Sequence, residues 1–453
     1  MDRQGVLFEG LFDKPVSVEF TGPAQSSDGG VVLLKAVDER LGLTRGMAEA
    51  VRDRRQSGKV VYAMVEMLRE RIFGIACGYP DGNDAAKLSG DPLMRLVCRG
   101  SVAADQSLAS QPTLSRMENA VKRADLVRMA YALTDTVIAE ERRRRRGRRV
   151  RQIVIDMDPT EDPTYGDQQL TFFNAHYDNW CYLPMVTTMQ FDGEAEQIFV
   201  APVLRPGNAK GSLGAKGLLK RLLARLRAAF PGACILVRMD GAFATPEVLA
   251  FLEAEKLGYA INMPKNAVLQ RLAAGLMRRV RAQVKVSGHT EKRYGQAMYQ
   301  AGKWPHARRV AIKAEQVVLE GREPRDNPRF VIHNLRKSPK QVYGFYAARG
   351  DMENRIKELH DGLRFDRTSC TDFLANQLRI LLAGAAYVLY QQLRRAAAGT
   401  ACARAQVWTL RDRLIKISVV VRESVRRILL EGPQAYPWLP IWRRVAFRLG
   451  ASP

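Results

Sequence analysis

The sequence predicts a mixed α/β protein, in which a sheet with flanking helices is followed by a basic insertion and further helices. Three observations support this prediction. Between residues 151 and 263, short apolar runs of strand type alternate with amphipathic helical patterns. Two of these runs end in an aspartate, at Asp158 and Asp240. The chain also carries 71 Lys and Arg against 47 Asp and Glu, a formal net charge of +24, which favours a polyanionic partner such as nucleic acid.

The composition is that of a globular protein of two or three domains. Of its 453 residues, 46% are hydrophobic and 26% are charged, which are ordinary values. Six widely spaced cysteines without a Cys-x-x-Cys pair predict reduced thiols and no zinc ribbon. The most apolar run, residues 380–390, is shorter than the roughly 20 residues that a bilayer span needs, and the first residues lack a signal-peptide pattern. We therefore expect a cytoplasmic protein without membrane contact.

The first part of the chain is expected to be helical. Residues 1–27 are rich in Gly, Pro and Ser in their second half and predict an extended lead-in. Over residues 28–140, apolar side chains such as Val60, Met64 and Leu68 recur at helical spacing. A compact helical domain with many arginines could bind DNA or mediate dimerisation. It could equally serve packing alone.

Residues 141–150 are predicted to form a basic linker. The run begins with Arg142, Arg143, Arg144, Arg145 and Arg146, and two more arginines follow Gly147. Such a run usually forms a solvated segment. Because it directly precedes the acidic strand, it could also follow a phosphate backbone near the reaction centre.

The stretch 151–160 reads as a strand with two acids on one face. Ile153, Ile155 and Met157 alternate with Val154, Asp156 and Asp158. Pro159 has no N–H for a ladder, so pairing should stop there and leave Asp158 at the strand end. Acids on an apolar strand are costly unless a cation holds them, and a divalent metal is the strongest such partner. An exposed edge or a buried ion pair is the alternative.

The rest of residues 151–263 completes the first part of a predicted catalytic core. The aromatic segment 172–182 is expected to be mainly core. Strands at 183–190 and 196–203 are separated by Asp192-Gly193, which predicts a hairpin. Helix, strand, helix and strand follow, and the strand from Cys234 ends at Asp240-Gly241. Active groups in such folds gather at strand ends.

The second half of the chain is basic and then helical. Residues 264–340 are expected to form a basic, mostly β insertion. Residues 341–395 contain a helix that continues the core, and residues 396–453 are expected to be a helical C-terminal region. On the core helix, five polar side chains recur at spacings of three and four: Tyr346, Arg349, Glu353, Lys357 and His360.

Three motifs together resemble a known family. Asp158-x-Thr160, Asp240-Gly241 and Tyr346-x-x-Arg349-x-x-x-Glu353 are similar to the motifs of bacterial insertion-sequence transposases of the DDE type, group-one branch. The resemblance covers about residues 20–430. It implies a ribonuclease-H-like mixed sheet with flanking helices and a β-rich insertion before the glutamate.

The resemblance implies roles for individual residues. Asp158, Asp240 and Glu353 would hold two Mg²⁺ ions, with Mn²⁺ as a substitute, and Asp156 competes with Asp158 as the first ligand. Phosphate contacts would come from the polar side chains of the later helix and from the arginine run, namely Tyr346, Arg349, Lys357, His360 and Arg142–Arg146. Related transposases often have a Lys where this chain has His360. Lys357, one turn earlier, is therefore an alternative for the phosphate contact.

The implied partners are two kinds of double-stranded DNA. The protein would bind terminal inverted repeats, cut there, and join the released end to target DNA, as a homodimer on the DNA and close to the bacterial nucleoid. Two alternatives remain open. The chain could be a ribonuclease-H-like nuclease without strand transfer, or a non-catalytic DNA-binding protein.

Overall fold

The chain folds into two compact units. The structure, a computed structural model, describes residues 6–8, 13–14, 16–18, 21–103 and 105–452. The first unit consists of Met1–Val121, Gly362–Arg364 and Ala385–Pro453, and the second of Lys122–Asp361 and Phe365–Gly384. The predicted lead-in, residues 1–27, lies partly outside the described residues. Its described part contains the paired strands β1 (Val6–Phe8) and β2 (Val16–Val18) and strand β3 (Gln25–Ser26).

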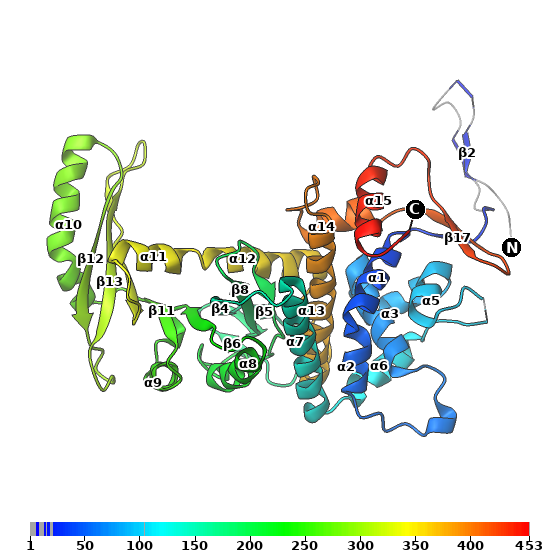
Figure 1. The fold of residues 1–453 in the computed structure, drawn as a ribbon, viewed down its shortest axis with the longest axis horizontal. Helices are drawn as coiled ribbons and strands as arrows, with labels where there is room; N and C mark the ends of the chain where they lie inside the picture. The colour runs from blue at the N-terminus through cyan, green and yellow to red at the C-terminus, as the bar shows by residue number, and fades with distance from the viewer. Residues whose placement is uncertain (1–5, 9–12, 15, 19–20, 104, 453) are drawn as a thin grey trace. The chain divides into compact units, whose positions relative to one another are not determined.

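A nine-stranded mixed sheet forms the centre of the second unit (Figure 1). Its order is β12-β13-β15-β11-β10-β4-β8-β9, with β14 paired to β13. The strands predicted for the core are β4 (Gln152–Pro159), β8 (Met185–Phe191), β9 (Ile198–Phe199), β10 (Cys234–Met239) and β11 (Gly258–Met263). Strand β10 is parallel to both β4 and β11, whereas β8 is antiparallel to β4 and to β9. This confirms the predicted mixed α/β class and is compatible with a ribonuclease-H-like fold.

Helices cover the sheet. Helix α11 (Pro339–Ala347) packs on one face through Val342, against a cluster that includes Val154 and Leu236. Helices α8 (Ala215–Ala229) and α9 (Pro246–Ala254) lie on the other side of the sheet (Figure 1). The β8–β9 hairpin turns at Asp192 and Gly193, with φ of 49° and 74°, as Asp-Gly predicts.

The basic insertion contains more helix than expected. It begins with the 21-residue helix α10 (Ala267–Ser287) and continues as β12 (Glu291–Tyr299), β13 (Arg308–Val317), β14 (Arg325–Asp326) and β15 (Arg329–His333). In α10 the buried residues Leu269, Ala273 and Met277 recur every four positions, and Asn266 caps the N-terminus by accepting from the backbone N of Leu269 at 2.9 Å. The strands extend the main sheet beyond β11.

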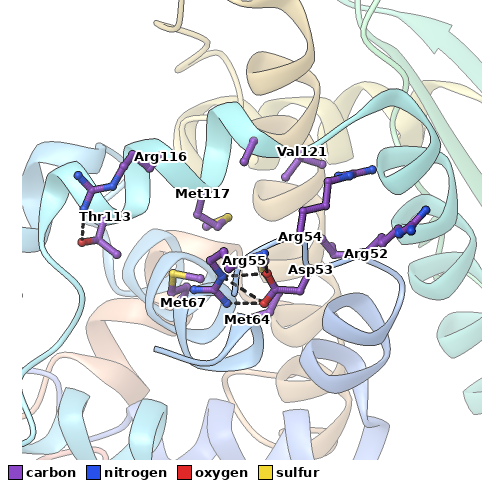
Figure 2. A pocket seen from close by; sticks show the side chains of 12 residues that line it. Arg52, Asp53, Arg54, Arg55, Met64, Met67, Thr113, Arg116, Met117 and Val121 are labelled. Atoms are coloured by element: carbon purple, nitrogen blue, oxygen red, sulfur yellow. Dashed lines mark hydrogen bonds and ion pairs between the residues drawn. The ribbon is translucent and has the colours of Figure 1, made fainter. Parts of the chain in front are cut away.

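The first unit is mainly helical before residue 121. Its helices are α1 (Val31–Leu41), α2 (Leu43–Glu49), α3 (Met64–Cys77), α4 (Ala85–Leu88), α5 (Pro92–Arg99) and α6 (Gln111–Ala120). A buried ion pair joins α3 to α6, with Arg71 Nε 2.7 Å from Glu118 Oε1. Figure 2 shows a cavity of about 390 Å³ in this unit, lined by Met64, Met67 and Met117 and by four arginines, Arg52, Arg54, Arg55 and Arg116.

The C-terminal region is only partly helical. The prediction of a helical region over residues 396–453 is wrong in part, because between residues 403 and 430 only α14 (Val407–Leu410) and the turn Arg411–Ile415 are helical. Strands β16 (Val419–Glu423) and β17 (Ile428–Glu431) pair with each other, and β16 also pairs with β3. The β-branched run at the start of β16 favours a strand. Helix α15 (Leu439–Arg448) follows.

The most apolar run lies in a long buried helix. Helix α13 (Phe373–Ala396) passes a length and hydropathy test for a membrane span, but 78% of its most apolar window is buried inside the fold. Tyr387 and Tyr390 are fully buried in it. The prediction of a buried helix at residues 380–390 is therefore confirmed.

Candidate active site

The two predicted strand-end aspartates are neighbours. Strands β4 and β10 run parallel, with Asp156 opposite Arg238 and Met157 opposite Met239. The next residues in this register are Asp158 and Asp240, and neighbouring strands lie about 4.8 Å apart. The two acids therefore lie side by side where the parallel strands β4 and β10 end. We call this end of the strands the carboxyl edge of the sheet. Asp240 is held further by the backbone N of Ala242, which donates to its Oδ1 at 3.0 Å.

Arg349 reaches this edge from the helices above the sheet. It lies between α11 and α12 (Gly350–Lys357), is only 8% exposed, and forms an ion pair with Asp158. Its Nε atom is buried and has no hydrogen-bond partner. A buried N–H without an acceptor is costly. This N–H can therefore donate a hydrogen bond to an anionic ligand.

The acids influence one another electrostatically. Burial raises the pKa of Asp158 to about 7; Arg349 lowers this pKa, while the charges of Asp240 and Glu353 raise it further. Burial also raises the pKa of Asp240, against the lowering effect of Arg349, Arg205 and His176. The carboxyl groups of Asp240 and Glu353 therefore both lie within electrostatic range of Asp158.

Glu353 is the least enclosed of the three acids. It lies on α12, one turn after Arg349, and its side chain is exposed. Among the residues that the structure describes, no three His, Cys, Asp or Glu side chains lie close enough together to hold one metal ion. The structure thus brings Asp158 and Asp240 together at the sheet edge, with Glu353 nearby on the helix.

Asp156 has a different environment from Asp158. It is fully buried, and Arg238 donates to both of its oxygens, each at 2.7 Å. Gln197 donates a third hydrogen bond at 3.0 Å. Burial raises the pKa of Asp156, and the contacts from Arg238 lower it. Since both carboxylate oxygens already have donors inside the sheet, Asp156 is bound as half of an ion pair, the alternative that the sequence left open.

Tyr346 lies beside the two edge aspartates. Burial raises its pKa to about 12, Arg349 lowers it, and the charges of Asp240 and Asp158 raise it further. Helix α11 places it there because its neighbours Tyr343 and Phe345 pack with it against the sheet face. Its hydroxyl is therefore near the group formed by Asp158, Asp240 and Arg349.

The two candidate bases after Glu353 lie in different places. His360 belongs to the helical turn Glu358–Gly362, and its Nε2 is 3.0 Å from the Oγ1 of Thr160, two residues beyond Asp158. Lys357 is exposed at the end of α12. Of the two, His360 contacts the end of strand β4.

Three further residues border the site, and the sequence assigned them no role. Arg205 is 2% exposed and donates to the carbonyl oxygens of Leu183 at 2.7 Å and Gly211 at 2.6 Å. Burial lowers the pKa of Arg205 to about 10, although nearby Asp240 and Tyr177 raise it. The other two residues are Tyr177, whose charge acts on Arg205, and His176, whose charge lowers the pKa of Asp240. In the sequence, the break Arg205-Pro206-Gly207-Asn208 between the hairpin and the next helix could have pointed to this loop.

The aromatic segment before the hairpin is only partly core, contrary to expectation. It forms the small sheet of β5 (Asp162–Pro163), β7 (Asn179–Tyr182) and β6 (Phe172–Asn174). Tyr182 is fully buried, but Phe173 and Trp180 are 48% and 56% exposed and stack edge to face across the strands. The two side chains pair across neighbouring strands on the exposed face of this small sheet. Their hydrophobicity alone does not predict on which face they lie.

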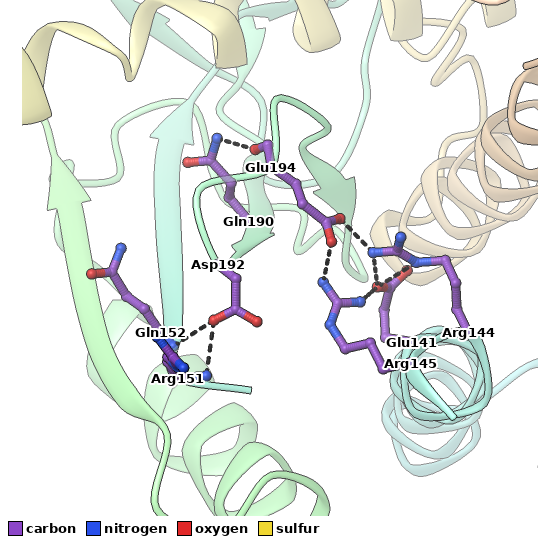
Figure 3. A network of polar contacts seen from close by, with 8 residues as sticks. All are labelled: Glu141, Arg144, Arg145, Arg151, Gln152, Gln190, Asp192 and Glu194. Carbon is purple, nitrogen blue, oxygen red and sulfur yellow. Dashed lines mark hydrogen bonds and ion pairs between the residues drawn. The ribbon is translucent and has the colours of Figure 1, made fainter. Parts of the chain in front are cut away.

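The arginine run is not the free linker expected from sequence. Helix α7 (Arg123–Arg145) continues through most of it. Arg144 and Arg145 both form ion pairs with Glu141 and with Glu194 of the β8–β9 hairpin (Figure 3), and Arg143 pairs with Glu140 at 2.7 Å. The exposed arginines beyond these pairs are Arg142, Arg146, Arg148 and Arg149.

A family model described as transposase DDE domain, group 1, matches residues 8–453. No curated protein matches the chain.

Proposed function

The chain belongs to the family of transposases with a group 1 DDE domain, and on this premise we propose that it cuts DNA at the ends of an insertion sequence and joins them to target DNA. The acids that we propose for this chemistry are Asp158, Asp240 and Glu353. The observation that carries the proposal is the pair of aspartates at the ends of parallel strands β4 and β10, beside Arg349.

The residues at the edge suit divalent cations. Asp158 and Asp240 face the buried guanidinium of Arg349, Glu353 lies within electrostatic range of Asp158, and hard carboxylate oxygens are the ligands that Mg²⁺ prefers. Burial disfavours the charged form of Asp158, as its pKa of about 7 indicates, and a bound cation would offset that cost. We propose two Mg²⁺ ions, replaceable by Mn²⁺, held by Asp158, Asp240 and Glu353. When bound, such ions activate the attacking oxygen and stabilise the leaving oxygen.

The contacts of Arg349 and Asp156 refine this ligand set. Arg349 occupies one oxygen of Asp158, so a cation takes the other oxygen or displaces the guanidinium. Asp156 has Arg238 on both oxygens, and we therefore assign it to positioning β10 against β4. This makes Asp158 the first ligand.

Arg349 and Tyr346 are proposed to hold the scissile phosphate. The unpartnered Nε–H of Arg349 supplies a charge-assisted donor for a phosphate oxygen. Tyr346 supplies a hydroxyl near the same acids, and its raised pKa keeps the proton in place for donation. His360, bonded to Thr160 at 3.0 Å, and Lys357 would contact phosphates farther along the strand.

The DNA substrates that we propose are those that the family membership suggests. We propose that terminal inverted repeats are bound first and that hydrolysis of a phosphodiester there releases a 3′-hydroxyl. That hydroxyl then attacks a target phosphodiester and displaces its 3′-oxygen. Because two ends have to be joined in one event, we expect a homodimer on the DNA.

Two single substitutions test the proposal. Asp240→Asn and Glu353→Gln remove one charge each with little change in shape, and should lower Mg²⁺-dependent strand cleavage by roughly 10³-fold. The matched control is Asp351→Asn, an exposed acid on the same helix as Glu353, which should retain cleavage. Retention of cleavage by either test variant would contradict the metal-ligand assignment.

Two observations favour a non-catalytic DNA-binding protein instead. No three metal-ligating side chains meet in the described part of the chain, and Arg349 already neutralises Asp158. A gel assay with labelled end DNA and a second duplex separates the possibilities. Strand transfer supports the transposase, cleavage alone indicates a nuclease, and binding without cleavage indicates the DNA-binding protein.

A further inference from the structure

The opposite end of strands β4 and β10, where they begin, carries many positive charges. We call it the amino edge of the sheet. A hollow of about 630 Å³ lies where α7 ends, β4 begins and α8 ends. Five arginines line it, together with apolar residues and no acid: Arg142, Arg143, Arg145, Arg148 and Arg149. A second hollow of about 470 Å³ shares Arg149 and adds Arg151 and one acid, Asp192. We call this surface the arginine hollow.

The arginine hollow is held in place by the fold. Asp192 of the β8–β9 turn accepts from the backbone N atoms of Arg151 at 2.8 Å and Gln152 at 2.9 Å (Figure 3). Glu194, from the same turn, pairs with Arg144 and Arg145. These contacts attach the last turn of α7 and the start of β4 to one hairpin, so the exposed arginines project from a defined surface.

The arginine hollow is far from the proposed catalytic edge. Gln152 and Asp158 are at opposite ends of β4, and six residues of strand span roughly 20 Å. The arginine run therefore does not lie next to the reaction centre, which was one expectation from sequence. A duplex advances 3.4 Å per base pair, so 20 Å corresponds to roughly six base pairs.

We propose that the arginine hollow binds the phosphate backbone of the duplex that is cut, roughly six base pairs from the scissile phosphate. This rests on the proposed function, which places the scissile phosphate at Asp158 and Asp240. The contacts come from Arg142, Arg148 and Arg149, which are exposed. Arg144 and Arg145 serve instead to fix the surface through Glu141 and Glu194.

The first test is the salt dependence of binding to duplex DNA of arbitrary sequence, with chelator present so that no cleavage occurs. The triple variant Arg142→Ala/Arg148→Ala/Arg149→Ala should reduce the slope of log K against log salt by roughly 2 to 3, since each phosphate contact contributes about 0.9. The corresponding triple lysine variant should restore the slope because an ammonium also neutralises phosphate.

A matched control removes the same charge elsewhere in the unit. Lys216→Ala/Lys220→Ala/Arg221→Ala takes three exposed bases from α8 and should leave the slope near that of the wild type. An unchanged slope in the arginine variant, or an equal fall in the control, would overturn the proposal. Arg148→Gln/Arg149→Gln, both beyond the end of α7, serves if the triple variant unfolds.

The second test locates the contact. Neutral methylphosphonate linkages, placed roughly six base pairs from the mapped cut, should weaken binding by the wild type but not by the triple alanine variant. No effect of these linkages would overturn the assignment to the same duplex. Failure of the metal site is distinguishable, because Asp240→Asn would then retain cleavage while the salt slopes are unaffected.

Discussion

The two edges of the main sheet differ in charge and in how that charge is held. At the carboxyl edge, Asp158 and Asp240 are partly buried; Asp158 forms an ion pair with Arg349, and the charge of Arg349 also acts on Asp240. At the amino edge, where β4 and β10 begin, exposed arginines line a hollow, and the neighbouring Arg144 and Arg145 form ion pairs with Glu194 of the β8–β9 turn. Costly buried acids are typical of a site that binds cations, whereas exposed bases contribute mainly to long-range attraction of a polyanion. One strand, β4, thus connects the region proposed for chemistry with the region proposed for DNA retention.

The largest expected effect on stability lies between the two edges, at Asp156. Its replacement by alanine would leave Arg238 buried at 1% exposure without its carboxylate, which should cost about 3–5 kcal/mol in the free energy of unfolding. Denaturant unfolding measures this. The matched variant Asp158→Ala should cost less, because Asp240 and Tyr346 still lie near Arg349. Equal losses of stability in the two variants would contradict the view that Asp156 stabilises the fold more than Asp158 does.

A smaller effect is expected when divalent cations are removed. If Asp158 and Asp240 hold Mg²⁺ or Mn²⁺, a cation at about 100 times its dissociation constant should add about 2.7 kcal/mol of stability. Thermal unfolding with and without chelator measures the shift. Asp240→Asn should lose the shift, whereas the arginine-hollow variant should keep it. A cation-dependent shift that survives in Asp240→Asn would place the cation elsewhere.

The smallest effect is expected at the amino edge, from Glu194→Gln. Glu194 is 39% exposed and pairs with Arg144 and Arg145, and such partly exposed pairs contribute about 0–1 kcal/mol. The change should lower stability by that amount at low salt, and the difference should fade as salt rises. Unfolding at two salt concentrations measures it. A salt-independent loss would mean that Glu194 acts through packing.

Much of the core could be predicted because its signals are local. The strand at Gln152–Pro159 follows from alternation and a terminal proline, and the hairpin from Asp192-Gly193. The ordered motifs around Asp158, Asp240 and Glu353 indicated the family, which the match over residues 8–453 shows. Their roles as ligands stay a prediction.

Other features could not be predicted because they depend on partners distant in sequence. The helix at Ala267–Ser287 was misjudged because its Val residues also suit strands, and packing against β12 and β13 decided the outcome. The exposure of Trp180 depends on which face of a small sheet it occupies. Arg205 is 35 residues before Asp240 in sequence, yet its charge acts on that acid.

By itself, the sequence determined the mixed α/β class, the strand that carries two aspartates and the surplus of positive charge that favours a polyanionic partner. Only the tertiary structure decided that Asp156 pairs with Arg238, that Asp158 lies beside Asp240, and that the arginine run is at the far end of β4. The physical reason is that periodicity and charge are properties of local sequence, whereas the partner of a charged side chain depends on strand register and helix packing.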